Sequence, residues 1–182
     1  MRWPTLWLIA RIEQGARLST PVETISTDTA LITGASSGIG EALAACFGAG
    51  GHRLVLVARR ASLLEALADK LRIAHGVKVW MLAADLAQPG AAAALAAQLR
   101  RKRVAVDVLV NCAGVSAPGD FMAMGGERAA GMIDLNVSGL TAMLAAFVPA
   151  MPQRGHGRVL NVASIAAFQP APSLAVYAAT KA

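Results

Sequence analysis

The sequence has few aromatic residues and little charge. Of its 182 residues, 4% are aromatic and 15% are charged, whereas 55% are hydrophobic. That hydrophobic share excludes a disordered chain and is enough for one large core. The apolar residues are mostly Ala, Leu and Val, the mixture expected of helices packed on a buried parallel sheet. The chain also has no linker rich in Pro, Gly or Ser, so we expect a single α/β domain.

Cysteine and histidine are also scarce. Cys46 and Cys112 are far apart and form no CxxC or metal-spaced cluster, which argues against a disulfide framework and a zinc site. His52, His75 and His156 stand beside glycines, and we interpret them as loop residues rather than metal ligands or catalysts. We therefore expect no metal, and a protein located in the reducing cytoplasm.

Long hydrophobic runs are absent as well. No uninterrupted apolar run reaches the length that spans a membrane, and the stretch at 3–10 is too short for a signal sequence. Residues 1–28 read as a poorly ordered leader, which is either a simple extension or a segment that contacts a membrane or a partner through Trp3 and Trp7. Residues 29–182 form the predicted domain.

Acidic residues are fewer than basic ones, which gives a net charge of +6 and a pI near 10.2. The basic residues are scattered, and their one dense run, from Arg100 to Arg103, follows a helical stretch rich in Ala and Leu. Cations there favourably meet the negative end of the helix. Because no aromatic residue is interleaved with the run, it predicts a solvated helix end and not a nucleic-acid surface.

Short apolar runs alternate with helical patterns after the leader, which is typical of βαβ units and a parallel sheet. The runs predict strands at residues 30–33, 53–58, 78–83, 106–111 and 158–163. The helical periodicity predicts helices at residues 38–48, 61–74, 90–101 and 127–151. The predicted fold is a doubly wound, Rossmann-like parallel sheet with helices on both faces, in three layers.

A glycine-rich turn follows the first predicted strand and opens an apolar helix. Glycine in this position lets the backbone approach a diphosphate, and the amino end of the helix offers free N–H donors and a favourable dipole. The order of strand, turn and helix favours dinucleotide binding over a purely structural turn. The candidate contacts are Thr33, Gly34, Ser36, Ser37, Gly38, Ile39 and Gly40.

The end of the second predicted strand distinguishes two forms of the dinucleotide. An acid there binds the 2′-hydroxyl of NAD, whereas an arginine suits the 2′-phosphate of NADP. Arg59 stands at this end without a neighbouring carboxylate, so the sequence favours NADP(H) over NAD(H). The alternative is that Arg59 and Arg60 form a solvated strand end. Asp85, after the third strand, is a candidate either for the adenine edge or for a helix cap.

Five motifs occur in a family-specific order. They are the turn that ends at Gly40, Asp85, Asn111-Cys112-Ala113-Gly114, Ser164, and Tyr177-Ala-Ala-Thr-Lys181. Over residues 29–182 the chain therefore resembles the short-chain dehydrogenase/reductase family, whose members are NAD(P)-dependent oxidoreductases acting between carbonyls and alcohols. Cys112 departs from the family, which usually has asparagine there, and we interpret it as a packing residue.

The resemblance implies roles for individual residues. Tyr177 is the general acid/base, Lys181 stabilises its phenolate and binds the nicotinamide ribose, and Ser164 orients the substrate carbonyl. Asn136 either holds a water for a proton relay or makes a structural hydrogen bond. The remaining cofactor contacts that the resemblance implies are Leu86, Asn111, Ala113 and Gly114, with Asn111 also tying the central strands together.

Family members normally continue well beyond the position that corresponds to Ala182. We therefore expect a C-terminally truncated fold that lacks the last strands and helices, and in which the predicted strand at 158–163 is a sheet edge. We also expect Ser173 to cap a short helix that carries Tyr177 and Lys181. On this expectation the 182-residue chain alone lacks robust reductase activity.

Two other functions remain open on the sequence. One is a non-catalytic, truncated module that binds a dinucleotide or a partner, and the other is an epimerase or dehydratase of the extended branch of the superfamily. The spacing of Gly34, Gly38 and Gly40 argues against the second. Related enzymes commonly pair through the helices that bear Asn136 and Tyr177. A homo-oligomer is therefore possible, and the sequence leaves the oligomeric state open. We expect a small carbonyl or alcohol substrate, with neither nucleic acid nor membrane as partner.

Overall fold

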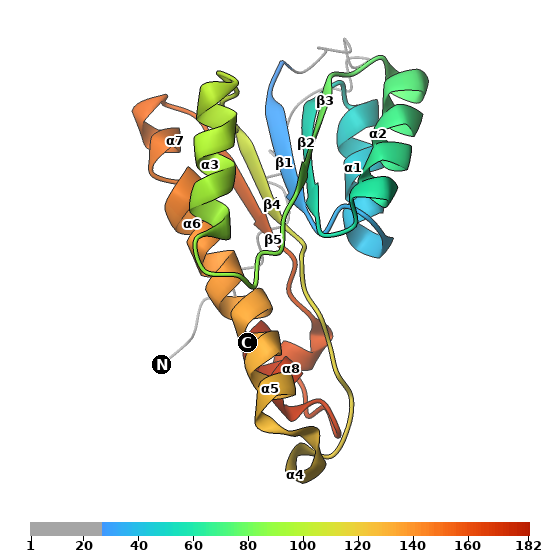
Figure 1. Cartoon of the computed structure of the whole chain (residues 1–182), viewed down its shortest axis with the longest axis vertical. Helices are drawn as coiled ribbons and strands as arrows, with labels where there is room; N and C mark the ends of the chain where they lie inside the picture. Colours follow the sequence, from blue (N-terminus) through green and yellow to red (C-terminus); the bar gives the residue numbers. More distant parts are fainter. Residues whose placement is uncertain (1–26) are drawn as a thin grey trace, which may run out of the picture.

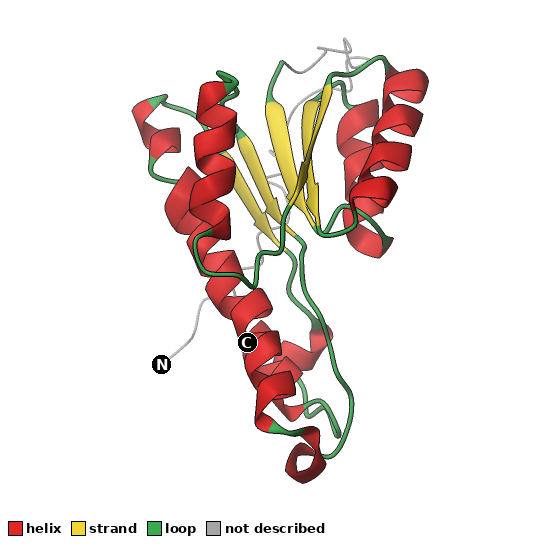
Figure 2. Cartoon of the chain, viewed as in Figure 1, coloured by secondary structure: helices red, strands yellow, loops and turns green. Residues whose placement is uncertain are grey.

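A computed structural model describes residues 27–182 of the chain. The predictions for the leader, including the surface contact through Trp3 and Trp7, lie largely outside the described residues. The described part contains a parallel sheet of five strands in the order β3-β2-β1-β4-β5 (Figures 1 and 2). The strands are β1 (Thr29–Thr33), β2 (Arg53–Ala58), β3 (Val79–Ala83), β4 (Val108–Asn111) and β5 (Arg158–Asn161). This arrangement confirms the predicted doubly wound sheet and, within residues 27–182, the edge position of β5.

Helices cover both faces of the sheet. Helices α1 and α2 pack on one face, and α3 and α6 pack on the other (Figure 1). The helices and helical turns are α1 (Gly38–Ala49), α2 (Ala61–His75), α3 (Ala91–Arg101), α4 (Phe121–Met124), α5 (Gly126–Ile133), η1 (Asp134–Gly139), α6 (Leu140–Phe147), α7 (Ala150–Gln153), η2 (Ile165–Ala167) and α8 (Ala175–Lys181).

The side chains of β1 explain why both faces are covered. Ala30 and Ile32 contribute to the core under α1 and α2, whereas Leu31, between them, contributes to the core under α3 and α6. Alternate residues of a strand point to opposite faces, so an unbroken apolar strand needs a helical layer on each side. Leu31 and Ile32 are fully buried, and each such side chain contributes about 1.5–3 kcal/mol by leaving water.

The strand order places a crevice at the carboxyl end of the sheet. From β1 the chain first builds outward through β2 and β3, and it then returns to the other side of β1 to add β4 and β5. The loops after β1 and β4 therefore leave the sheet in opposite directions. Ligands of open α/β sheets bind at this point of reversal.

Three predicted strands were too long. β3 begins at Val79 instead of residue 78, β4 begins at Val108 instead of 106, and β5 ends at Asn161 instead of 163. Ahead of β4 the chain is still turning, since Asp107 uses its side chain as well as its backbone to contact Thr29. Beyond β5 the main chain leaves the sheet for the turn η2. Hydrophobic periodicity alone does not locate the residues at which the chain enters or leaves the sheet.

The helix predicted at 127–151 is interrupted by a wider π-helical turn, η1, at Asp134–Gly139. Gly139 ends this turn and has no room for a side chain, because a Cβ on it would lie 2.6 Å from the carbonyl oxygen of Leu86, in the loop after β3. The helical run Gly126–Gln153 is the one stretch within residues 27–182 that is long and apolar enough to cross a membrane. This is weak evidence, because core helices of other proteins pass the same test, and this run packs on α3 and β4.

The last helix begins later than predicted. Ser173 has a left-handed backbone (φ +62°) and does not cap α8, whose N-cap is Leu174, with no side-chain capping bond. The helix α8 packs against η2, α5 and η1, so tertiary contacts hold a helix that is too short to be stable alone.

Charged side chains gather where the strands begin, at the end of the sheet opposite the crevice. Nε2 of His156 lies 3.3 Å from Oδ1 of Asp107 and 3.5 Å from Oδ1 of Asp28, and the backbone N–H of Thr29 donates to Oδ2 of Asp107 at 2.9 Å. His156 is thus more than the loop residue that the sequence predicted. Its ligand atom and those of the two aspartates all lie within 4.8 Å of one another, as in a metal site, but Arg154 also lies 3.5 Å from Asp107. The expected lack of a metal stays a prediction.

Candidate active site

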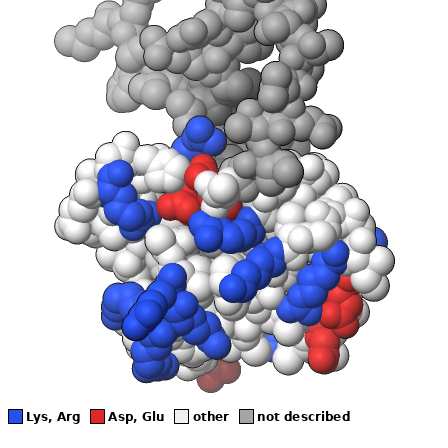
Figure 3. All heavy atoms as spheres, turned by 90° about the horizontal axis from the view of Figure 1, so that it is seen from above, with Lys and Arg blue, Asp and Glu red and all other residues white. Residues whose placement is uncertain are grey.

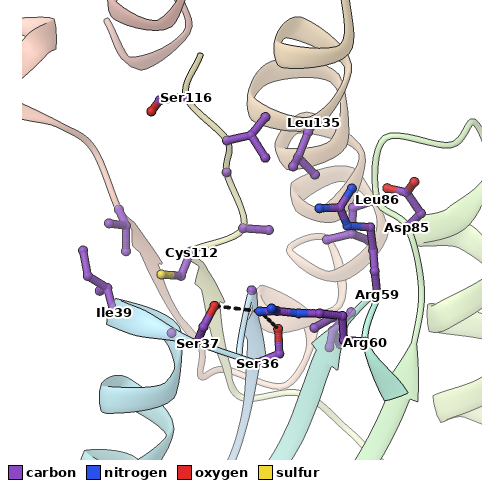
Figure 4. Close-up of a pocket in the computed structure, with 18 of the residues that line it drawn as sticks. Ser36, Ser37, Ile39, Arg59, Arg60, Asp85, Leu86, Cys112, Ser116 and Leu135 are labelled. Carbon is purple, nitrogen blue, oxygen red and sulfur yellow. Dashed lines mark hydrogen bonds between the residues drawn. The ribbon is translucent and has the colours of Figure 1, made fainter. Parts of the chain in front are cut away.

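A cavity of about 390 Å³ lies at the carboxyl ends of the strands, where the strand order reverses (Figure 4). It extends from the glycine turn and the end of β2 to Tyr177 and Lys181 on α8. Predicted site residues that line it are Gly34, Ser36, Ser37, Ile39, Gly40, Arg59, Asp85, Leu86, Ala113, Gly114, Tyr177 and Lys181. Predicted site residues that do not line it are Thr33, Gly38, Asn111, Asn136 and Ser164.

The glycine turn is packed too closely for side chains at two of its positions. Gly34 has φ +68°, and a Cβ there would lie 2.8 Å from Cα of Ala113. A Cβ on Gly40 would collide with the carbonyl oxygen of Gly34. The turn therefore presents bare backbone at the amino end of α1, where N–H groups and the helix dipole favour an anion.

Thr33 supports this turn from behind. Its side chain is buried, and its Oγ1 accepts from the backbone N–H groups of Cys112 and Ala113, each at 3.0 Å, while donating to the carbonyl of Val110 at 3.3 Å. The hydroxyl thus fixes the loop after β4 against the turn after β1. Thr33, predicted as a cofactor contact, shapes the cavity from outside it.

Two arginines stand at the mouth of the cavity beside β2 (Figure 4). Arg60 donates to the hydroxyl oxygens of Ser36 and Ser37, at 3.0 and 2.9 Å. Arg59 reaches instead towards Asp85 and Leu86 in the close-up. Both guanidinium groups are exposed, so the strand end offers two cations where the sequence analysis proposed one.

Asp85 does not cap a helix. Its Oδ1 accepts from the backbone N–H of Ala87 at 3.1 Å, whereas the N-cap of α3 is Gly90. The aspartate closes a local turn and lines the cavity together with Leu86. The helix-cap alternative is therefore wrong for α3.

Asn111 joins two strands and is buried. Its Nδ2 donates to Oδ1 of Asn161 at 2.9 Å, which links β4 to β5, as the sequence analysis expected of a strand-tying residue. Next to it, Cys112 lines the cavity. Burial raises the pKa of the Cys112 thiol, and the Lys181 ammonium offsets part of that rise. A thiol that stays protonated fits the predicted packing role.

Asn136 makes several hydrogen bonds inside the protein. Its Oδ1 accepts from the N–H of Val115, and its Nδ2 donates to the carbonyl of Val115 and to Oγ1 of Thr180, all at 2.9 Å. It is 2% exposed. Both amide protons are used, so the predicted structural role is present. Only the second lone pair of Oδ1 remains on this side chain for a relay water.

The residues of α8 and the end of β5 meet at the far side of the cavity. Nζ of Lys181 donates to the carbonyl of Val162 at 2.9 Å and lies over Gly114, where a Cβ would come within 3.3 Å of it. Within residues 27–182, no hydrogen bond occupies the phenol hydroxyl of Tyr177. Ser164 accepts from the N–H of Ala166 at 3.2 Å, which leaves its own proton available for donation.

Sequence reasoning missed three contributors. Arg60 was set beside Arg59 as a solvated residue, although two serines spaced within the glycine turn were a signal for a second donor. Thr180 lies inside the motif from Tyr177 to Lys181, but the motif assigns it no role, and the carbonyl of Val162 belongs to no motif. They hold Asn136 and Lys181 in place. The sequence signals Thr180 only by its hydroxyl next to Lys181, and it does not signal a backbone carbonyl at all.

Comparisons with known proteins agree with this geometry. The family model "short chain dehydrogenase" matches residues 28–182. An uncharacterized oxidoreductase of Myxococcus xanthus is 36% identical over 158 residues, which cover 87% of this chain and 62% of the relative. Oxidoreductase UcpA of Escherichia coli is 36% identical over 155 residues, covering 85% and 58%. The chain spans about half to three fifths of the length of the curated relatives that it matches first.

Solved structures show the same arrangement. A short-chain dehydrogenase from Sphingobium yanoikuyae in complex with NADPH is 42% identical, with a TM-score of 0.79 over 85% of this chain and 60% of that one. L-sorbose reductase from Gluconobacter frateurii, complexed with NADPH and L-sorbose, is 36% identical, with a TM-score of 0.82 over 86% and 60%.

Proposed function

Because the chain belongs to the short-chain dehydrogenase family, we propose that it serves an NADP(H)-dependent oxidoreductase, with hydride transfer between the nicotinamide and a carbonyl or alcohol. The observation that carries the proposal is the cavity itself. One end has bare backbone and two arginines, and the other end has Tyr177 and Lys181. Ser164 lies outside the lining and begins the turn η2, which packs against α8. Both solved relatives named above hold NADPH.

The residues present fit a nicotinamide dinucleotide. The backbone of Gly34 and the amino end of α1 suit the diphosphate. Gly40 and Gly114 also line the cavity with bare backbone, because a side chain at either position would displace a neighbour. Arg59 and Arg60 suit a 2′-phosphate, since a planar guanidinium binds phosphate through paired hydrogen bonds. When bound, the cofactor supplies the hydride.

The catalytic end supplies the proton. Tyr177 donates its phenol proton to the substrate oxygen in reduction and takes it back in oxidation. Among the described residues, only the carbonyl of Val162 accepts a hydrogen bond from the Lys181 ammonium, which leaves two of its protons for the cofactor, and its charge stabilises the phenolate. Ser164 donates its free proton to the same substrate oxygen.

Asn136 acts in this proposal by positioning. It ties Thr180, which lies between Tyr177 and Lys181 on α8, to the loop at Val115. A proton relay through a water at Asn136 remains a proposal, and it would use the second acceptor position of Oδ1.

The preference for NADP(H) is tested by titrating the purified chain with NADPH and NADH and following nicotinamide fluorescence. Arg59→Gln and Arg60→Gln should each weaken NADPH binding about tenfold or more, because a charged hydrogen bond contributes about 1.5–3 kcal/mol, and should leave NADH binding unchanged. Arg53→Gln, at the other end of β2, is the matched control and should change neither affinity. Equal affinity of the unaltered chain for both cofactors would contradict the preference.

A second measurement separates catalysis from binding. If the chain binds NADPH and also reduces a carbonyl substrate, Tyr177→Phe should abolish turnover and leave NADPH affinity within about twofold. Binding without turnover would favour the dinucleotide-binding module as the function of the 182-residue chain. Turnover would instead refute the expectation that this chain alone lacks robust activity.

A further inference from the structure

A second cavity, of about 340 Å³, lies near the end of the sheet where the strands begin. The first cavity, between the glycine turn and Lys181, lies at the other end of the strands and is called the dinucleotide cavity below. The second cavity is formed by α3, by the segment that precedes β4, and by the ends of α6 and α7. Its volume is within the range of small-molecule sites. Leu99, Ala146 and Phe147 contribute apolar walls, and three arginines belong to its lining: Arg100, Arg103 and Arg154.

The three arginines are not equivalent. Arg154 is held in place, because its Nη2 donates to the carbonyl of Val106 at 2.6 Å and lies 3.5 Å from Oδ1 of Asp107. Arg100 and Arg103 are exposed, and within residues 27–182 their side chains make no hydrogen bond or ion pair. The lining therefore holds two guanidinium groups whose donors are unused. Lys and Arg make up most of the charge on this face (Figure 3).

The end of α3 does not need these side chains. The carbonyls of Gln98, Leu99 and Arg100 already accept backbone N–H groups from the three residues that follow the helix, at 2.9–3.1 Å. Complementing the helix dipole, the role that the sequence predicted for the basic run, is served equally by Arg101 and Lys102, which do not line the cavity. That role therefore does not account for Arg100 and Arg103 at the cavity.

Arg103 also has an unfavourable backbone. Its φ is +55°, the left-handed region in which a residue other than glycine costs about 1–2 kcal/mol. With the backbone turn that this φ produces at the end of α3, Arg103 lines the cavity together with Arg100.

We propose that this cavity binds a small amphipathic anion, a carboxylate with an apolar tail. The tail is buried against Leu99, Ala146 and Phe147, as apolar surface leaving water requires. The carboxylate accepts from Arg100 and Arg103, because a guanidinium binds a carboxylate through two parallel hydrogen bonds. A neutral molecule with the same tail lacks the hydrogen bonds to the arginines, and an inorganic anion lacks the burial of an apolar tail.

Calorimetric titration of the full chain with sodium octanoate tests the proposal, with 1-octanol and inorganic phosphate as comparison ligands. Octanoate should bind at least tenfold more tightly than either. Arg100→Gln and Arg103→Gln should each weaken octanoate binding about tenfold, and Arg101→Gln, in the same basic run but outside the lining, should change it less than twofold. Ala146→Leu should fill the cavity and weaken binding by a similar factor.

Several results would overturn the proposal. They are the absence of octanoate binding at millimolar concentration, equal affinity for octanoate and octanol, or an equal loss of octanoate affinity in Arg101→Gln. The last result would show that octanoate is attracted to the whole basic surface and not to the cavity. The proposal does not rest on the proposed oxidoreductase function. NADPH titration of the same variants should give unchanged affinities, so a failure at this cavity is distinguishable from a failure at the dinucleotide cavity.

Discussion

Two glycines on the long helical run should respond in opposite ways to the same substitution. Gly131, in α5, is exposed, and a Cβ there would meet nothing within 4 Å. Gly139, in η1, is buried, and its Cβ would lie 2.6 Å from the carbonyl oxygen of Leu86 and 3.2 Å from that of Asp134. Gly131→Ala and Gly139→Ala therefore differ in packing and not in chemistry.

The structure sets the sign and the size of each effect. In an open helical position alanine is about 0.8–1 kcal/mol more favourable than glycine, so Gly131→Ala should raise the free energy of unfolding by about that amount. At Gly139 the same gain is offset by overpacking, which costs about 1–3 kcal/mol and more where backbone must move. Both close neighbours are backbone atoms, which cannot rotate away. Gly139→Ala should thus be destabilising by about 1–2 kcal/mol net.

Urea unfolding followed by circular dichroism measures both variants against the unaltered chain. Gly139→Ala should also weaken NADPH binding, because the displaced Leu86 lines the dinucleotide cavity, whereas Gly131→Ala should not. Equal stability of the two variants would refute the argument that Gly139 is required for the approach of the helix to the loop after β3.

Two further outcomes follow from single side chains. Asn136→Ala should lower the free energy of unfolding by about 1–3 kcal/mol, because it leaves buried backbone groups of Val115 unpaired. Ser138→Ala, at an exposed position two residues further on, is the control and should change that free energy by less than about 0.5 kcal/mol; urea unfolding compares the two variants. Since the raised pKa of Cys112 lowers its thiolate fraction, iodoacetamide should label it several-fold more slowly than exposed Cys46 at pH 8, with the difference shrinking as pH rises, as mass spectrometry of the two peptides would show; equal rates would contradict the burial of Cys112.

The parts of the fold that the sequence predicted well are those with local causes. The five apolar runs became the five strands, and the glycine turn lies between β1 and α1, because a buried strand and a tight turn each depend on a few neighbouring residues. Gly34 illustrates the point: its positive φ and its closeness to Ala113 both belong to a turn that its sequence context already indicated. The order of motifs then carried the family resemblance.

The parts that were missed depend on contacts between distant segments. The π-helical turn η1 forms where Gly139 lies against Leu86, which is more than fifty positions earlier in the sequence. Helical periodicity depends on local spacing and therefore does not predict that contact. Ser173 is a good capping residue by type, yet its left-handed backbone moves the start of α8 to the next residues. Arg59 and Arg60 are adjacent, and only the fold shows which of them reaches the serines of the turn.

The hydrogen bonds of Asn136 have a consequence for the order in which the cavity is built during synthesis. The glycine turn and the end of β2 are complete within the first sixty residues, and neighbouring strands can pair as they emerge. The end of the cavity at Tyr177 and Lys181 forms later, because the Asn136 amide must bond both Val115 and Thr180, and Thr180 is translated long after Val115. A growing chain thus completes the glycine turn and the arginine end of the cavity well before it can place Tyr177 and Lys181 at the other end.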